Sequence, residues 1–260
     1  MSQSETILFE TDTDLGHYQV VDRIYEGRPA RVLFSGPSRS AQSGIGLDDD
    51  PDLLFDYNQR LLEVANALYP AHILVIGGGA FTLPMALGAS LPDATVDVVE
   101  LDSGLPAIAK DYFGLKPSDR LRIITDDGRG YLESTDQQYD MIVLDVFQNL
   151  SVPRQFLTAE FIELVNNHLT ANGSLAMNII ATYQGRNTGL IKSQIAGYSN
   201  SFTSVTVFPA AHGLTAWLPQ NLVLVAQKQP LEDLATYVRF TPFELLPTNV
   251  SDILTDDLVR

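Results

Sequence analysis

The 260-residue sequence has no cysteine, four histidines, and 16 lysine and arginine residues against 32 aspartate and glutamate residues. Without cysteine there can be no disulfide, thiolate metal site or cysteine nucleophile. The histidines show no HxH or HxxxH spacing, so we expect no metal site. No apolar run approaches the ~20 residues of a membrane span, and the first residues are polar and acidic, unlike a signal peptide. We therefore expect a cytoplasmic protein without a membrane partner.

The shortage of basic residues gives a net charge of −16, while 45% of the residues are hydrophobic. These proportions are typical of a globular protein. The negative charge disfavours a nucleic-acid partner, because phosphates would be repelled over most of the surface, and it would attract a cationic substrate. An alternative is that the acidity serves only solubility, and the segments 48–50 and 252–257 have the composition of solvated charge.

The chain is organised around a strand, a glycine turn and a helix. Residues 73–76 form a wholly apolar run that ends in Gly77, Gly78 and Gly79, and residues 81–88 follow with a helical pattern. Pro84 fits only in the first turn of that helix. This order predicts free N–H groups at the helix start and close approach of a ligand to the backbone. A tight turn without a ligand is the alternative.

A second signal comes from the strand predicted over residues 95–100. Its last residue is Glu100, 23 residues after Gly77. In dinucleotide and nucleoside folds an acidic residue at about this distance binds the ribose hydroxyl pair. The glycine turn and Glu100 together predict a nucleoside site.

From residue 72 onward strands and helices alternate, which predicts an α/β fold with a mostly parallel, doubly wound sheet. The last two strands are joined by a loop too short for a crossover helix, so we expect them to pair antiparallel at one edge. Near the start of the chain, strands at 18–25 and 30–34 and a turn or short strand near 35–38 form a small antiparallel unit. A helix over 53–69 joins the two parts. The expected elements of the second part are strands 72–76, 95–100, 121–125, 139–145, 174–180, 204–208 and 221–226, and helices 104–113, 129–134, 158–169 (closed by Asn172-Gly173) and 187–201.

Acidic residues also follow two further strands, where ligands bind in such sheets. Asp126, Asp127 and Gly128 offer carboxylates and N–H groups suited to an adenine edge, or else form a plain turn. Asp145 directly follows the apolar run 141–144, so its carboxylate should face the cleft. A cap for the next turn is the alternative role for Asp145.

Jointly, these segments resemble the spermidine synthases, or polyamine aminopropyltransferases, and especially a divergent bacterial spermidine synthase-like branch. The resemblance extends over about residues 15–228. It rests on Gln42-Ser43, Asp50-Pro51 with Tyr57, residues 77–84, 99–102 and 127–128, Tyr139-Asp140 with 145–147, and 156–158.

The resemblance implies a Rossmann-like fold of the class I S-adenosylmethionine methyltransferase type, with residues 1–52 as a small N-terminal β domain and 53–260 as the nucleoside-binding domain. It also implies a homodimer that moves an aminopropyl group from decarboxylated S-adenosylmethionine to a small cationic amine. Asp145 would take a proton from the attacking amine, and Tyr57 would line the substrate pocket. The implied cofactor contacts are Gln42, Gly77, Gly78, Gly79, Glu100, Leu101, Asp126, Asp127 and Gly128.

The sequence departs from the family pattern at several carboxylates expected around a cationic amine. Ala80 and Gln148 stand where the family has aspartates, and Asn58-Gln59 replaces its His-Glu pair after Tyr57. A doubly charged diamine such as putrescine would lose charge-assisted hydrogen bonds of about 1.5–3 kcal/mol each. Three hypotheses follow: an aminopropyltransferase with altered acceptor specificity, a methyltransferase using intact S-adenosylmethionine, and a non-catalytic nucleoside-binding homologue.

Overall fold

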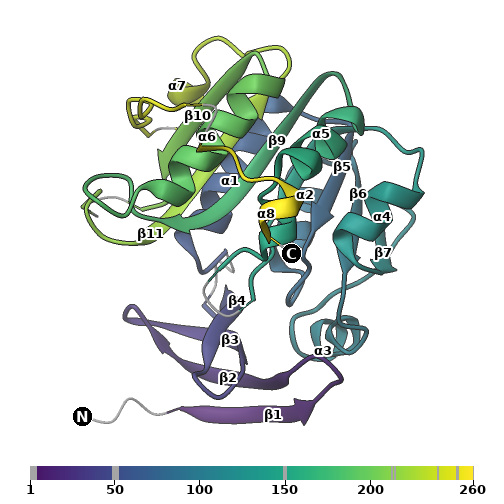
Figure 1. Ribbon diagram of the computed structural model, residues 1–260. Helices are drawn as coiled ribbons and strands as arrows, with labels where there is room; N and C mark the ends of the chain where they lie inside the picture. The colour runs from purple at the N-terminus through teal and green to yellow at the C-terminus, as the bar shows by residue number, and fades with distance from the viewer. Residues whose placement is uncertain are drawn as a thin grey trace.

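A computed structural model describes residues 5–48, 53–148, 151–211, 213, 215–238, 240–249 and 252–259. It contains a small sheet and a larger sheet flanked by helices (Figure 1). The sequence features at Asp49, Asp50 and Pro51, and the predicted domain boundary at 52/53, lie outside the described residues. That boundary stays a prediction.

The small sheet is antiparallel and has four strands in chain order. They are β1 (Thr6–Asp12), β2 (His17–Tyr25), β3 (Arg28–Ser35) and β4 (Ser40–Gly46). The sequence analysis predicted β2 and β3. It expected a turn or short strand near 35–38, which is earlier than β4, and it did not predict β1. The side chains of β1 are mostly exposed, so the strand lacks the buried alternation that identifies β2 and β3.

Hydrogen bonds and apolar packing attach the small sheet to the rest of the chain. Thr13 Oγ1 donates to Asp102 Oδ2 at 2.6 Å, and Arg31 Nη1 donates to the carbonyl of Tyr112 at 2.8 Å. Ser43 Oγ accepts the N–H of Ala80 at 3.0 Å. Val20 and Leu33 are fully buried in the same core cluster as residues of the large sheet. The small sheet is therefore docked by both apolar and polar contacts.

The large sheet has seven strands in the order β10-β11-β9-β8-β5-β6-β7. The pairs β9–β8, β8–β5, β5–β6 and β6–β7 are parallel, and β11 runs antiparallel to both of its neighbours. The predicted doubly wound sheet with an antiparallel edge is confirmed. The strands are β5 (His72–Ile76), β6 (Thr95–Glu100), β7 (Leu121–Thr125), β8 (Tyr139–Leu144), β9 (Leu169–Ala181), β10 (Ser204–Pro209) and β11 (Gln220–Gln227).

Helices cover both faces of this sheet and bury two separate apolar clusters. One cluster takes side chains from α1, α2 and α3, and the other from α4, α5 and α6. Within the described residues, no helix is both long and apolar enough to cross a membrane. The helices are α1 (Asp56–Leu68), α2 (Thr82–Ser90), α3 (Leu105–Tyr112), α4 (Gly128–Ser134), the 3-10 helix η1 (Arg154–Phe156), α5 (Ala159–Asn167), α6 (Gly189–Ser201), α7 (Leu234–Val238) and α8 (Asp256–Val259).

The boundary between α5 and β9 differs from the prediction. The helix ends at Asn167, and β9 begins at Leu169 and continues through the Asn172-Gly173 pair that was expected to close the helix. His168 explains the early end, because its carbonyl accepts the N–H of Tyr139 and so starts the pairing with β8. Its ring contacts the carbonyls of Leu164 and Thr135 at 2.9 and 3.0 Å.

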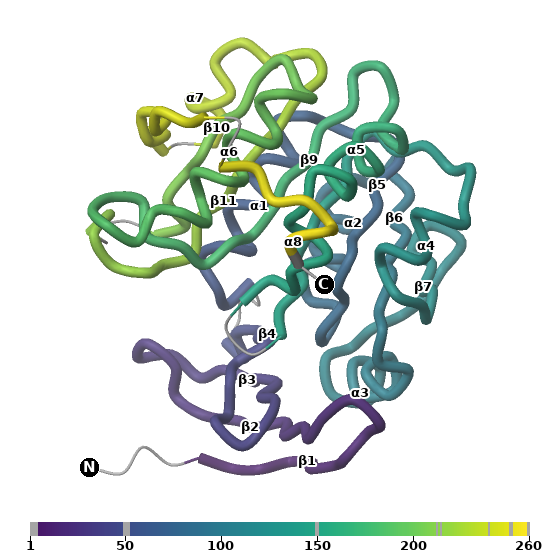
Figure 2. Tube along the Cα trace, in the orientation of Figure 1, coloured from purple at the N-terminus to yellow at the C-terminus, as the bar shows by residue number. Residues whose placement is uncertain are grey.

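The C-terminal segment returns to the body of the molecule rather than extending as a charged tail (Figure 2). Asp256 at the start of α8 receives two hydrogen bonds from the Arg129 guanidinium, at 2.9 and 2.6 Å. Ala159 N–H donates to the carbonyl of Leu254 at 2.8 Å. Asp256 is therefore paired with a cation rather than fully solvated. The prediction that the whole of 252–257 is solvated charge is wrong for this residue.

Candidate active site

Two cavities adjoin at the carboxyl ends of the parallel strands. The first, the strand-end cavity, has a volume of about 440 Å³ and is lined by the turn after β5, the end of β6, the start of α4 and residues after β8. The second, the aromatic cavity, has a volume of about 650 Å³ and lies between β4, the start of α1 and the neighbouring strands β9 and β11. Gln42, Tyr57 and Phe147 line both cavities.

The glycine turn after β5 has a shape that side chains would block. Gly77 has φ +100°, and a Cβ atom there would lie 2.2 Å from the carbonyl oxygen of Asp145. A Cβ on Gly79, at φ +53°, would lie 2.6 Å from Ser43 Oγ. Gly77 and Gly79 therefore let the backbone pass close to β8 and to the small sheet, which places bare backbone along the strand-end cavity.

Glu100 accepts hydrogen bonds from the N–H groups that the sequence analysis predicted to be free for a ligand. Its Oε2 accepts the N–H groups of Gly78 and Gly79 at 2.7 and 3.1 Å, and its Oε1 accepts that of Asp102 at 2.8 Å. Burial raises the pKa of Glu100 even though these bonds favour its ionised form. A carboxylate offers about four acceptor directions. One direction on Oε1 therefore remains for a ligand hydroxyl, rather than the two of a hydroxyl pair.

The next strand end holds Asp127 inside the lining and leaves Asp126 outside it. Asp127 caps α4 by accepting the N–H of Gly130 at 2.8 Å, and its second oxygen accepts Gln155 Nε2 at 3.2 Å. Asp126 is exposed, is absent from the cavity lining, and accepts the N–H of Asp127 at 2.8 Å. Asp126 thus lies outside the lining of this cavity, and its expected contact with adenine stays a prediction.

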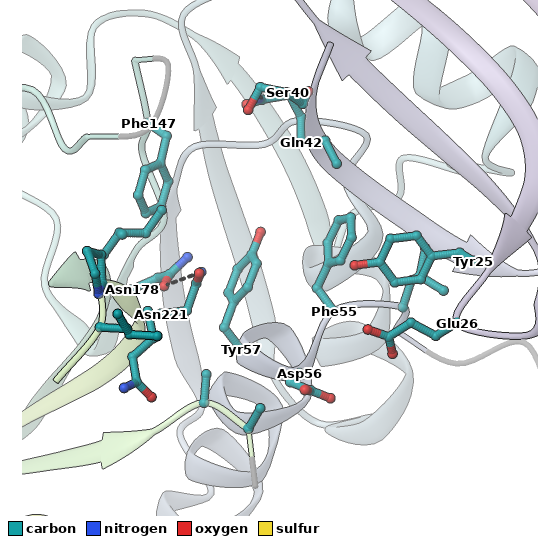
Figure 3. A pocket seen from close by; sticks show the side chains of 18 of the residues that line it. Tyr25, Glu26, Ser40, Gln42, Phe55, Asp56, Tyr57, Phe147, Asn178 and Asn221 are labelled. Atoms are coloured by element: carbon teal, nitrogen blue, oxygen red, sulfur yellow. Dashed lines mark hydrogen bonds between the residues drawn. The ribbon is translucent and has the colours of Figure 1, made fainter. Parts of the chain in front are cut away.

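Asp145 lies between the two cavities. Its carboxylate lines the strand-end cavity, and its Oδ1 accepts Nδ2 of Asn178 at 3.0 Å. Asn178 lines the aromatic cavity and, through its own oxygen, accepts Nδ2 of Asn221 at 3.1 Å, the contact drawn in Figure 3. Among the described residues Asn178 is the one hydrogen-bond partner of the carboxylate. Burial raises the pKa of Asp145 from 3.8 to about 6.

A row of aromatic rings forms one wall of the aromatic cavity. The rings of Tyr25 and Phe55 meet edge to face with centroids 5.7 Å apart, and those of Phe55 and Tyr57 stack at 6.0 Å. Burial, and then the nearby charge of Asp145, raise the pKa of the Tyr57 hydroxyl well above its usual value. In Figure 3 this hydroxyl points toward the gap between Phe147 and Gln42.

The structure brings together ten of the eleven site residues expected from the sequence. These residues line the strand-end cavity: Gln42, Tyr57, Gly77, Gly78, Gly79, Glu100, Leu101, Asp127, Gly128 and Asp145. Sequence reasoning missed Asn178, Asn221 and Gln155. A single asparagine in the apolar run 175–180 was the one available signal for Asn178. Within the part of the chain that the structure describes, no group of three or more potential metal ligands comes together.

Comparison with known proteins assigns the chain to a family. The model of the spermine/spermidine synthase domain matches residues 54–214, more than half of the chain. The chain belongs to this family. The predicted resemblance is therefore confirmed, and the family is one of transferases of the polyamine aminopropyltransferase type, as expected.

Individual relatives agree with this assignment and add a second activity. The chain is 35% identical over 116 residues to the polyamine aminopropyltransferase of Vibrio vulnificus, a match that covers 44% of this chain and 39% of that protein. It is 28% identical over 206 residues to the human eEF1A lysine and N-terminal methyltransferase, covering 75% and 26%. The chain thus spans well under two thirds of the length of these relatives.

The fold agrees with a solved structure over almost the whole chain. A probable spermidine synthase from Corynebacterium glutamicum superposes with a TM-score of 0.78 at 23% identity, covering 90% of this chain and 86% of that one. The predicted Rossmann-like fold with a small N-terminal sheet is therefore confirmed.

Proposed function

We propose that this protein transfers an aminopropyl group from decarboxylated S-adenosylmethionine to an amine. The observation that supports this most is the position of Asp145: its carboxylate lines one cavity and is hydrogen-bonded to Asn178, which lines the other. A base at such a junction can meet an amine from one side and an adenosyl sulfonium from the other. We further propose that the protein acts as a homodimer.

The strand-end cavity suits the adenosyl co-substrate. Its volume of about 440 Å³ lies in the range of small-molecule sites. Bare backbone at Gly77 and Gly78 leaves room for the sulfonium side of the molecule, and Glu100 has an acceptor direction left for a ribose hydroxyl. Apolar side chains of Ile76 and Phe156 line the part next to Gly128, where an adenine ring would be excluded from water.

The reaction needs a neutral amine. An alkylammonium ion has a reference pKa near ~10, so it must lose a proton before its lone pair can attack. The nitrogen then forms a bond to the aminopropyl carbon attached to sulfur, the bond between that carbon and sulfur breaks, and its electron pair stays on sulfur to give the neutral thioether methylthioadenosine. The proton from nitrogen goes to the Asp145 carboxylate.

The raised pKa of Asp145 favours this role. An ordinary aspartate near 3.8 is a much weaker base than a carboxylate whose pKa is about 6. The pKa of Asp145 thus lies about two pH units closer to the pKa of the ammonium ion, which makes the proton transfer less unfavourable by roughly 3 kcal/mol. The same burial disfavours the charged ammonium, unless its charge is paired with the carboxylate.

Methyl transfer from intact S-adenosylmethionine is the second candidate, and Ala80 supports it. The intact cofactor keeps a carboxylate that an aspartate at this position would repel. The Ala80 side chain is neutral and fully buried, and its N–H already donates to Ser43 Oγ at 3.0 Å. Ala80 removes a repulsion but supplies no group to hold that carboxylate, so we place aminopropyl transfer first.

Side-by-side calorimetric titration with S-adenosylmethionine, its decarboxylated form and methylthioadenosine tests this proposal. We expect the decarboxylated form to bind at least several-fold more tightly than the intact cofactor. Tighter binding of the intact cofactor would move the assignment to methyl transfer. Binding of none of the three would indicate a homologue that has kept the fold without the catalysis.

A further inference from the structure

The aromatic cavity differs from what a dicationic substrate requires. Its polar lining consists mainly of neutral groups, among them the side-chain amides of Asn178, Asn221 and Gln220. The rest of the wall is aromatic and aliphatic. A second ammonium group placed among these amides would lose its hydration, and none of the described residues offers it a carboxylate there. The lining therefore penalises a second charge on the substrate.

Among the described residues, two carboxylates touch this cavity, those of Glu26 and Asp56. Glu26 and Asp56 are both exposed to solvent. Figure 3 shows them beside Phe55 and Tyr25, on the opposite side of Tyr57 from Asn178 and Asn221. Charges in water are screened and hold a partner ion weakly. Neither residue therefore provides a desolvated site for a distal ammonium group.

One buried amide oxygen in the lining lacks a partner. Gln220 is 6% exposed, and its Nε2 donates to the carbonyl of Thr215 at 2.7 Å. Its Oε1 has no hydrogen-bond partner among the described residues. Gln220 therefore adds a neutral side chain, and no charge, to this lining.

We infer that the acceptor is a primary amine with one cationic nitrogen and an apolar body, such as an alkyl or aryl-alkyl monoamine, held in the aromatic cavity with its nitrogen toward Asp145. This inference rests on the proposed aminopropyl transfer and gives its substrate class. The nitrogen meets the carboxylate at the junction, while the body lies along the ring row Tyr25–Phe55–Tyr57. Substrate choice is then made by excluding a second charge.

Hexylamine and cadaverine form a matched pair for testing this, because they differ only in a terminal methyl group against a terminal ammonium group. With decarboxylated S-adenosylmethionine as donor, we expect kcat/KM for hexylamine to exceed that for cadaverine by at least tenfold, and phenethylamine to be accepted as well. Equal or better use of cadaverine or putrescine would overturn the inference while leaving aminopropyl transfer intact.

Direct binding separates the two proposals. Each amine is titrated calorimetrically into the protein saturated with methylthioadenosine. Hexylamine that binds more tightly than cadaverine without any transfer would keep the substrate preference and remove the proposed reaction. Failure of hexylamine and phenethylamine to bind would overturn the inference, whatever the result for transfer.

Three variants test whether the preference arises in the aromatic cavity. Phe55→Ala should raise KM for phenethylamine about tenfold with kcat nearly unchanged, whereas Tyr237→Ala should have no effect, since Tyr237 is 58% exposed and lines neither cavity. The double variant of Glu26→Gln and Asp56→Asn should leave hexylamine transfer within twofold. A large loss in that double variant would show that these carboxylates hold the substrate and would contradict the inference.

Discussion

The two cavities use acidic residues in opposite ways. In the strand-end cavity the carboxylates of Glu100 and Asp127 are already bonded to backbone N–H groups, so they fix the shape of the turns. In the aromatic cavity the inner polar groups are neutral amides, and the two carboxylates are at the solvent. A chain with a net charge of −16 therefore places little of that charge where an acceptor would bind.

Asp145 lines the strand-end cavity at the point where the two cavities meet. A single side chain, Asn178, bonds to its carboxylate among the described residues, compared with three backbone donors at Glu100. Both groups are buried enough to have a raised pKa. From this difference we expect Glu100 to fix the turn while keeping one acceptor direction for a ligand, and Asp145 to be the carboxylate that takes a proton.

The largest expected effect comes from removing the proposed base. Asp145→Asn keeps the size of the side chain but cannot take a proton, so aminopropyl transfer should fall by about 10²–10⁴-fold. Binding of methylthioadenosine should stay within twofold. Radiolabelled transfer and calorimetry measure the two quantities, and Asp126→Asn, which lies outside the lining, is the matched control. Unchanged turnover would remove Asp145 as the base.

The next effect tests whether the close approach of the backbone at Gly77 to Asp145 requires glycine. Gly77→Ala should lower the free energy of unfolding by about 3 kcal/mol or more, because the new Cβ would lie 2.2 Å from a backbone oxygen at φ +100°. Gly114→Ala is the control: it has φ +76° but nothing within 4 Å, so it should cost only ~1–2 kcal/mol. Equal shifts of the denaturation midpoint would mean that the close approach to Asp145 is unimportant.

A third effect concerns stability against pH. The pKa of Asp145 rises from 3.8 to about 6 on folding, so ionisation of this group destabilises the fold as the pH rises through about 6. Asp145→Asn should therefore be more stable than the native protein at pH 8, by roughly 1–3 kcal/mol, with the difference vanishing near pH 3. Urea denaturation at both values measures it. Because the base must be ionised, transfer should rise with pH through about 6. A variant less stable at pH 8 would contradict the raised pKa.

The smallest expected effect sharpens the role of Glu100. Glu100→Gln replaces one acceptor oxygen by a donor, which cannot receive the N–H groups of the turn. Affinity for methylthioadenosine should fall about tenfold, corresponding to ~1.4 kcal/mol. Glu232→Gln, on an exposed residue, is the control. Unchanged affinity would exclude a contact between Glu100 and the nucleoside.

Much of this arrangement could be predicted from the sequence because it depends on local patterns. The apolar run before Gly77 and the one before Asp145 identify two parallel strands, and parallel strands end at the same edge. The prediction could not assign the N–H groups of the turn to Glu100. Whether a carboxylate faces a ligand or a neighbouring loop depends on side-chain direction, which spacing does not encode.

Asn178 shows a second limit. It follows Met177, which pairs with Leu144 in the register of β9 and β8, and so lies beside Asp145. That register contains an irregularity between Tyr139 and Met141, and β9 begins earlier than its hydrophobic pattern indicates. A shift of one residue would turn the amide to the other face of the sheet. The pairing of strands 33 residues apart therefore had to be seen in the structure.

The hydrogen bond between Ser43 and Ala80 links ligand binding to the docking of the small sheet. Ser43 lines the strand-end cavity beside Gln42, so a nucleoside would touch both sheets at once. A ligand that binds only the docked form stabilises docking by mass action. Amide hydrogens of β2 to β4 should then exchange more slowly when the nucleoside is bound, although their own hydrogen bonds lie within the sheet and away from the ligand. Amide exchange in the small sheet would therefore show whether a nucleoside is bound, although most residues of the site belong to the large-sheet part of the chain.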